Sequence, residues 1–141
     1  MWSDALPGHP IALRPLSAGE LFGELGTPNL QIYWLPWGAD YPDPQDFLSL
    51  DFFPEAANNF GTVGLPTATT LTRQADIELS PSKRINAYNQ AEQLLVTSVA
   101  WIPLDQGMGA YLLRPNVVNY QESPVGGPSI GAWQHVYLGK L

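Results

Sequence analysis

Apolar residues recur at helical spacing in one long segment of the chain. After Ser80, they follow one another at intervals of three or four residues, which places them on one face of a helix. Ser80 and Pro81 form a typical helix start, because the fixed φ of proline suits the first helical position. We predict a helix over residues 80–100. Its buried stripe is expected to consist of Ile85, Tyr88, Ala91 or Glu92, Leu95 and Val99.

A second helix is predicted over residues 17–25 by a pattern at its N-terminus. Ser17 and Glu20 have the spacing of a capping box, in which each side chain accepts a hydrogen bond from the main-chain N–H of the other residue. Gly26 is a suitable residue to end this helix. The apolar face is short and is formed by Leu21, Phe22 and Leu25.

Proline marks the start of two further helices. Asp43 is predicted as an N-cap, with Pro44 at the first helical position and a short helix or irregular turn through Phe52. Pro66 is predicted to open a helix that reaches Ala75, after a loop over residues 58–66.

Several short segments are rich in β-branched and aromatic residues, or alternate between apolar and polar positions, and both features favour strands. These segments are 10–16, 29–34, 110–113 and 133–138, with a shorter extended piece at 116–120. Because two of them flank the helix predicted at 17–25, we expect a strand–helix–strand unit with a parallel pair of strands.

Together, these elements predict an α/β fold, with a mixed sheet and flanking helices. A chain of 141 residues fits one domain. We expect a lead-in over residues 1–9, an α/β body over 10–120, and an irregular tail with a final strand over 121–141.

The candidate binding residues lie in the stretch from Trp34 to Pro44, which follows a predicted strand. It contains two Trp, one Tyr, two Asp and three Pro. Proline fixes φ and removes N–H donors, so this stretch is expected to be a stiff turn. Such a turn can present aromatic side chains and carboxylates to a ligand. The alternative is that the Trp residues belong to the core and the acids cap helices.

Paired carboxylates in this turn also allow a hypothesis of catalysis. Tyr41 and the Trp residues could stack on a sugar, and Asp40 and Asp43 could act as acid and base. An alternative function is therefore a module that binds or cleaves a glycan through Trp34, Trp37, Asp40 and Asp43. No third acidic residue is tied to the turn, and His9 and His135 lie far apart with no metal-binding spacing. We therefore predict no catalytic residues, no metal site and no cofactor, and a protein that is not an enzyme.

The charge of the chain disfavours two kinds of partner, nucleic acids and anionic lipids. The net charge is −7, and the six Lys and Arg residues are scattered. Nucleic acids and anionic lipids need clustered cations, so an acidic chain of this kind suits a cationic ligand better. There is no Cys, the N-terminus has no signal-peptide pattern, and no apolar run has the length of a membrane span.

Several segments, in the right order, resemble the family 5 extracellular solute-binding proteins, which are the peptide-binding components of ABC transporters. Residues 37–44 resemble the tryptophan, alanine-aspartate-tyrosine and aspartate-proline run of that family's C-terminal lobe. The other segments that resemble the family are residues 58–61, Arg84 and Tyr88 with residues 90–92 and 94–95, and residues 102–104.

This resemblance implies part of the C-terminal lobe of a periplasmic-binding-protein type II fold. It implies capture of a peptide or similar small solute for import, without covalent chemistry. The Asp that matches Asp40 pairs with the α-amino group of the ligand, and Trp37 and Tyr41 match residues that line the same region. The parent family works with an ABC permease and is periplasmic or extracellular.

Proteins of this family are far longer, and the chain corresponds to their C-terminal part. A lobe without its partner exposes apolar surface and strand edges, so self-association is expected. The tail over 121–141 is expected to dock on another copy or to lie irregularly on the surface. An alternative function is therefore that of an oligomerising remnant that binds no ligand.

Overall fold

The computed structural model describes residues 2–9, 11–125 and 133–140 of the chain. It divides into two compact units, Met1–Trp34 and Leu35–Leu141.

The first unit contains two short helices, α1 (Trp2–Ala5) and α2 (Ala18–Glu24). The helix predicted at 17–25 is confirmed, and so is its capping box, in which Glu20 accepts from the main-chain N–H of Ser17 at 2.8 Å. Gly26 follows the helix with a φ of +76°, a conformation that glycine adopts without strain. The apolar face of α2 is not buried, and Phe22 is mostly exposed.

The two strands predicted in the first unit are wrong. Residues 11–16 and 29–34 belong to no helix or strand, and Pro10 lies outside the described residues. The expected strand–helix–strand unit and its parallel pair are therefore absent from the described part of this unit. β-Propensity reflects packing of side chains on a pleated surface. Leu13 and Ile32 are exposed and have no such surface to pack on.

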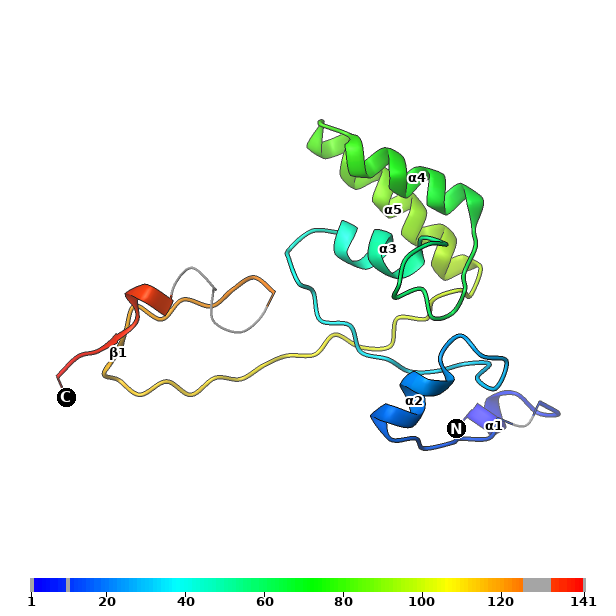
Figure 1. Cartoon of the computed structure of the whole chain (residues 1–141), viewed down its shortest axis with the longest axis horizontal. Coiled ribbons are helices and arrows are strands. Elements are labelled where there is room, and N and C mark those ends of the chain that lie inside the picture. Colours follow the sequence, from blue (N-terminus) through cyan, green and yellow to red (C-terminus); the bar gives the residue numbers. More distant parts are fainter. Residues whose placement is uncertain (1, 10, 126–132, 141) are drawn as a thin grey trace. The chain divides into compact units, whose positions relative to one another are not determined.

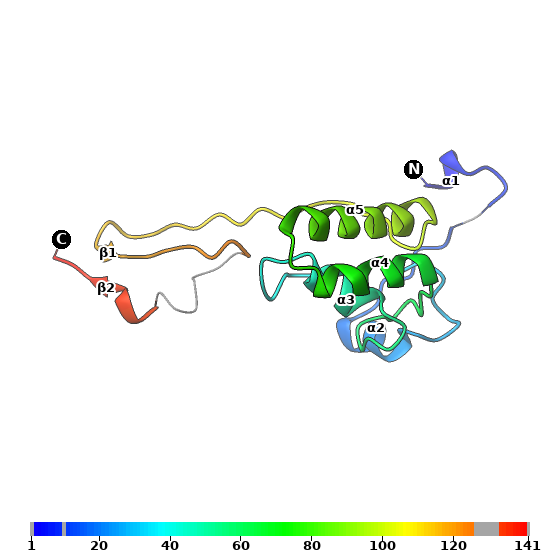
Figure 2. The same cartoon turned by 90° about the horizontal axis from the view of Figure 1, so that it is seen from above.

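The second unit is built around three helices that pack on one another: α3 (Gln45–Phe52), α4 (Pro66–Ile77) and α5 (Pro81–Thr97). Figures 1 and 2 both show α4 and α5 side by side. Apolar residues of all three helices form the buried core, which consists of Leu48, Ala68, Ala75, Tyr88, Ala91 and Leu95. The helices predicted from Pro66 and Ser80 are thus confirmed, and the segment after Pro44 is a helix.

The buried stripe of α5 is confirmed at Tyr88, Ala91 and Leu95 and is wrong at its two ends. Ile85 is exposed, and Val99 lies beyond the end of the helix. There Val99 has a φ of 58°, while the main-chain N–H of Ala100 donates to the carbonyl of Leu95 at 3.0 Å. These are features of a Schellman C-cap, which turns the chain out of the helical path and takes Val99 off the buried face.

The chain after α5 has little regular structure. Residues 101–114 belong to no helix or strand, so the strand predicted at 110–113 is wrong. Strands β1 (Val117–Val118) and β2 (Tyr137–Leu138) pair antiparallel, with Val117 opposite Leu138, and a short 3-10 helix, η1 (Trp133–His135), precedes β2. The extended piece at 116–120 is therefore confirmed in shorter form. The final strand predicted at 133–138 is confirmed only at Tyr137–Leu138 and is wrong at Trp133–His135, which form the 3-10 helix.

The small sheet corrects the expected sheet type. The two strands of the described residues are antiparallel, so the expected mixed sheet is wrong, although helices and a small sheet do occur together. The described part of the tail contains a final strand, β2, which pairs with β1 of the same chain. Residues 126–132 and 141 of that tail lie outside the described residues. No described helix has the length and apolar character needed to span a bilayer.

Candidate functional site

The predicted binding residues Trp37, Asp40 and Tyr41 lie on one turn, residues 37–43, that leads into α3. Asp46, at the start of α3, forms two hydrogen bonds with this turn. Its Oδ2 atom accepts hydrogen bonds from the indole Nε1–H of Trp37 at 3.0 Å and from the main-chain N–H of Asp40 at 3.1 Å. Asp46 is fully buried, so these bonds are shielded from water.

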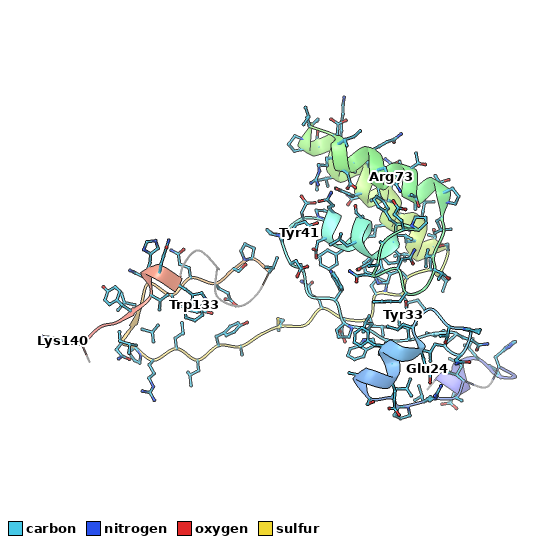
Figure 3. All side chains as sticks on the ribbon, in the orientation of Figure 1. Glu24, Tyr33, Tyr41, Arg73, Trp133 and Lys140 are labelled. Atoms are coloured by element: carbon cyan, nitrogen blue, oxygen red, sulfur yellow. The ribbon has the colours of Figure 1, made fainter. Side chains whose placement is uncertain are left out.

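The side chains of Asp40 and Tyr41 are exposed on this turn. Tyr41 is labelled in Figure 3, and its hydroxyl donates to Oε1 of Gln45 at 3.3 Å. The main-chain carbonyl of Tyr41 accepts from the N–H of Asp43 at 2.8 Å. The turn therefore has a fixed main chain and carries an accessible carboxylate.

The residues of this turn do not line the small pocket found in the second unit. That pocket, with room for about one water molecule, lies instead within the helical core. Its lining is mainly apolar and consists of Leu48, Phe52, Phe53, Leu65, Ala68, Thr69, Thr72 and Leu95. Of the three predicted binding residues, Asp40 and Tyr41 are exposed, whereas Trp37 is partly buried.

Asp43 has a different role from the predicted N-cap. The N-cap position belongs to Pro44, one residue later, although Oδ1 of Asp43 does accept from the main-chain N–H of Gln45 at 2.8 Å. Its main partner is Arg84 of α5, which donates to both carboxylate oxygens at 2.6 and 2.8 Å. The hydrogen bonds from Arg84 hold the pKa of the Asp43 carboxyl below its ordinary value. An acid fixed in this ionised pair is unsuited to the role in glycan cleavage considered above.

Arg84 belongs to a larger polar network between the helices. Its Nη2 donates to the hydroxyl of Tyr88 at 2.8 Å, and that hydroxyl donates to Oδ1 of Asp76 at 2.7 Å. Ser49 of α3 donates to both oxygens of Asp76, at 2.9 Å each. Burial, followed by the hydrogen bond to Asp76, raises the pKa of the Tyr88 phenol, which stays protonated as the donor to Asp76. The network therefore joins α3, α4 and α5.

Two carboxyl groups of α3, those of Asp46 and Asp51, are buried or partly buried without full hydrogen bonding or charge compensation. Oδ1 of Asp46 is buried and has no hydrogen-bond partner among the described residues. Burial raises the pKa of Asp51 to about 7, and the nearby charge of Asp46 adds to the shift. Within residues 2–9, 11–125 and 133–140, no group of three or more His, Asp or Glu side chains is placed to hold a metal ion.

Sequence reasoning did not identify Arg84 and Asp46 as the residues that hold the turn. Arg84 and Tyr88 are four residues apart on a predicted helix, which indicates that they share a face. The partner of Arg84, Asp43, lies 41 residues away. No spacing rule connects residues at that separation.

Comparison with known proteins identifies one peptide-binding relative. The chain is 26% identical over 122 residues to the probable di/tripeptide-binding protein 5 of Pseudomonas aeruginosa (strain UCBPP-PA14). The match covers 84% of this chain, and the chain spans only 23% of the length of that relative. No protein-family model matches the chain. No solved structure matches it. The relative is named for binding and not for a reaction, which agrees at that coarse level with a solute-binding role.

Proposed function

We propose that this chain forms part of a solute-binding protein that captures di- or tripeptides, or similar small solutes, without covalent chemistry. The observation that carries the proposal is the turn at 37–43. Its main chain is fixed by buried Asp46, while the carboxylate of Asp40 stays exposed. The similarity to a di/tripeptide-binding protein supports the same ligand class.

In this proposal, Asp40 attracts the α-ammonium group of a peptide. An ionised carboxylate forms charge-assisted hydrogen bonds with an ammonium group, and these are stronger than neutral ones. Trp37 and Tyr41 border the same turn, and aromatic rings add attraction for a cation. The net charge of −7 favours the approach of a cationic group over an anionic one.

The wider setting of the proposal is solute import. An ABC permease would receive the ligand, and the protein would act in the periplasm or outside the cell. The position of the gene tests this part directly, because permease and ATPase genes beside it are expected. A genomic neighbourhood with no transporter genes would contradict the import role.

Self-association is proposed from the segment that follows α5. Large apolar side chains are exposed throughout it, at Ile102, Leu104, Met108, Tyr111, Leu112 and Leu113. Exposed apolar surface of this kind commonly marks an interaction site. Light scattering on the purified chain is expected to show a mass above 15.4 kDa that rises with concentration. A mass that stays at the monomer value at high concentration would contradict self-association.

The binding proposal is tested by calorimetry with three probes. A dipeptide with a free amino terminus, its N-acetyl derivative and an oligosaccharide are titrated into the full 141-residue chain. We expect saturable heat with the free dipeptide and little with the other two. Binding of the oligosaccharide alone would favour the glycan module built on Trp34, Trp37, Asp40 and Asp43. Absence of binding by all three would favour the ligand-free oligomer.

A further inference from the structure

Two separate contacts hold the turn at 37–43, one at each end. Asp46 accepts hydrogen bonds from Trp37 and from the main chain of Asp40. Arg84 binds the carboxylate of Asp43 at the other end of the turn. The first contact lies within a short stretch of sequence, whereas the second ties the turn to a distant helix.

We propose that Arg84 is a positioning residue for the peptide-amine contact of Asp40, an inference that rests on the proposed function. Arg84 does not touch the ligand in this proposal. It holds the end of the turn through Asp43, and the geometry of the turn sets the direction of the Asp40 carboxylate.

The contact between Arg84 and Asp43 requires arginine. The guanidinium group donates to both carboxylate oxygens, which fixes the orientation of the carboxylate plane. Nη2 of Arg84 also donates to Tyr88, and the guanidinium carbon lies 4.8 Å from the centre of the Tyr88 ring. Lysine keeps the charge but provides no planar fork, so the replacement of Arg84 by lysine is not conservative here.

Arg84 is itself held in place by the helices. Tyr88, which is 1% exposed, accepts from Arg84 and donates to Asp76 of α4. Asp76 in turn accepts from Ser49 of α3. Hydrogen bonds therefore connect the guanidinium group of Arg84 to all three helices, and through Arg84 they connect the turn to the helical core.

Main-chain contacts carry this restraint from Asp43 to Asp40. The N–H of Asp43 donates to the carbonyl of Tyr41 at 2.8 Å, and its carbonyl accepts from the N–H of Asp46 at 3.1 Å. Asp46 then accepts from the N–H of Asp40. Loss of the two hydrogen bonds from Arg84 to Asp43 would therefore weaken the contacts on both sides of Asp40.

The chain offers a matched control for Arg84. Arg73 of α4 forms an ion pair with Glu55, and its guanidinium carbon lies 4.4 Å from the centre of the Phe53 ring. It thus has the same two kinds of partner, a carboxylate and an aromatic ring. Neither Glu55 nor Phe53 belongs to the turn at 37–43, so Arg73→Lys reports the general effect of such a replacement.

The experiment compares Arg84→Lys with Arg73→Lys in the full chain. Without ligand, NMR measures hydrogen exchange at the main-chain N–H of Asp40 and at the indole N–H of Trp37. We expect exchange at Asp40 to become about tenfold faster in Arg84→Lys, because local opening becomes easier, and to stay unchanged in Arg73→Lys. With the free-amine dipeptide, affinity is expected to fall about tenfold in Arg84→Lys only, which corresponds to the loss of one well-placed hydrogen bond.

The outcomes separate this inference from the proposed function. Equal exchange at Asp40 in wild type, Arg84→Lys and Arg73→Lys would overturn the positioning role, with or without a ligand. If wild type binds no dipeptide, the proposed function fails, and the exchange data still decide whether Arg84 holds the turn. Should Arg84→Lys not fold, Asp43→Asn is measured in its place. This variant removes the charge of the other partner, whose side chain is 30% exposed.

Discussion

The three-helix group of the second unit and the segment that follows it are both rich in apolar residues, yet only the helices bury them. Leu95 of α5 is 2% exposed, whereas Leu112 is 102% exposed. Tyr88 and Tyr111 differ in the same direction. In the helices, apolar residues at helical spacing face a second helix. In the described part of residues 101–114, no regular element provides such a facing surface.

This difference shows that a segment rich in apolar residues does not form a buried core by composition alone. A side chain is buried when its element places it against another element, and polar groups between the elements then need partners. The network of Arg84, Tyr88, Asp76 and Ser49 meets that need in the helical group. The candidate binding turn is attached to this ordered region through Asp43 and Asp46.

The contrast is tested most strongly by truncating one leucine in each region. Leu95→Ala removes packed atoms from the core and is expected to lower the free energy of unfolding by about 3 kcal/mol. Leu112→Ala removes exposed atoms and is expected to change it by less than about 0.5 kcal/mol. Urea unfolding at low protein concentration measures both variants. An equally large loss in Leu112→Ala would show that the segment is buried in solution, and the contrast would fail.

The helical region also contains a group, Asp51, whose ionisation is expected to lower the free energy of unfolding. Its native pKa of about 7 lies above the ordinary value of 3.8, because burial disfavours the charged form. Between these values the native state binds more protons than the unfolded chain, so stability falls as pH rises from about 4 to 7. We expect Asp51→Asn to remove most of this fall. The full shift would correspond to about 4 kcal/mol, and we expect about half of that because Asp51 is only partly buried.

The measurement for Asp51 is thermal or urea unfolding over the range from pH 4 to pH 8. Asp105→Asn is the matched control, because Asp105 is exposed within residues 101–114. The comparison rests on the slope with pH, since an asparagine also changes stability by an amount that does not depend on pH. An unchanged slope in Asp51→Asn would contradict the proposed effect of burial.

Val99 lies at the boundary between the two regions and is expected to give the smallest effect. Its φ of 58° is unfavourable for a β-branched residue, while glycine adopts such a conformation freely. Because Val99 is mostly exposed, Val99→Gly sacrifices little packing. We expect the free energy of unfolding to rise by about 0.5 to 1 kcal/mol, as measured by urea unfolding. A clear loss of stability would show that the Val99 side chain is packed in solution.

The helices could be predicted from sequence because their signals are local. Ser17 with Glu20, and Ser80 with Pro81, mark helix starts within a few residues, and periodicity indicates which face of α5 is buried. The strands could not, because a strand needs a partner at a distance that sequence does not specify. Residues 29–34 and 110–113 have strand-like composition and no pairing partner among the described residues.

The candidate site divides in the same way. The residues that would contact a ligand, Trp37, Asp40 and Tyr41, stand close together in sequence and could be proposed from their types. Whether they bind a peptide stays a prediction. The residues that hold them, Arg84 with Tyr88 and Asp76, come from other helices. Only the folded arrangement shows that Arg84 meets Asp43.

The most direct measurement is the affinity of wild type and Asp40→Asn for a free-amine dipeptide and for its N-acetyl derivative, by calorimetry. Asparagine keeps the main chain and its hydrogen bond to Asp46, so only the charge is removed. We expect wild type to prefer the free amine, and we expect Asp40→Asn to lose at least about tenfold in affinity for it and to lose the preference. Unchanged binding of the free dipeptide by Asp40→Asn would contradict the proposed contact between Asp40 and the peptide amine.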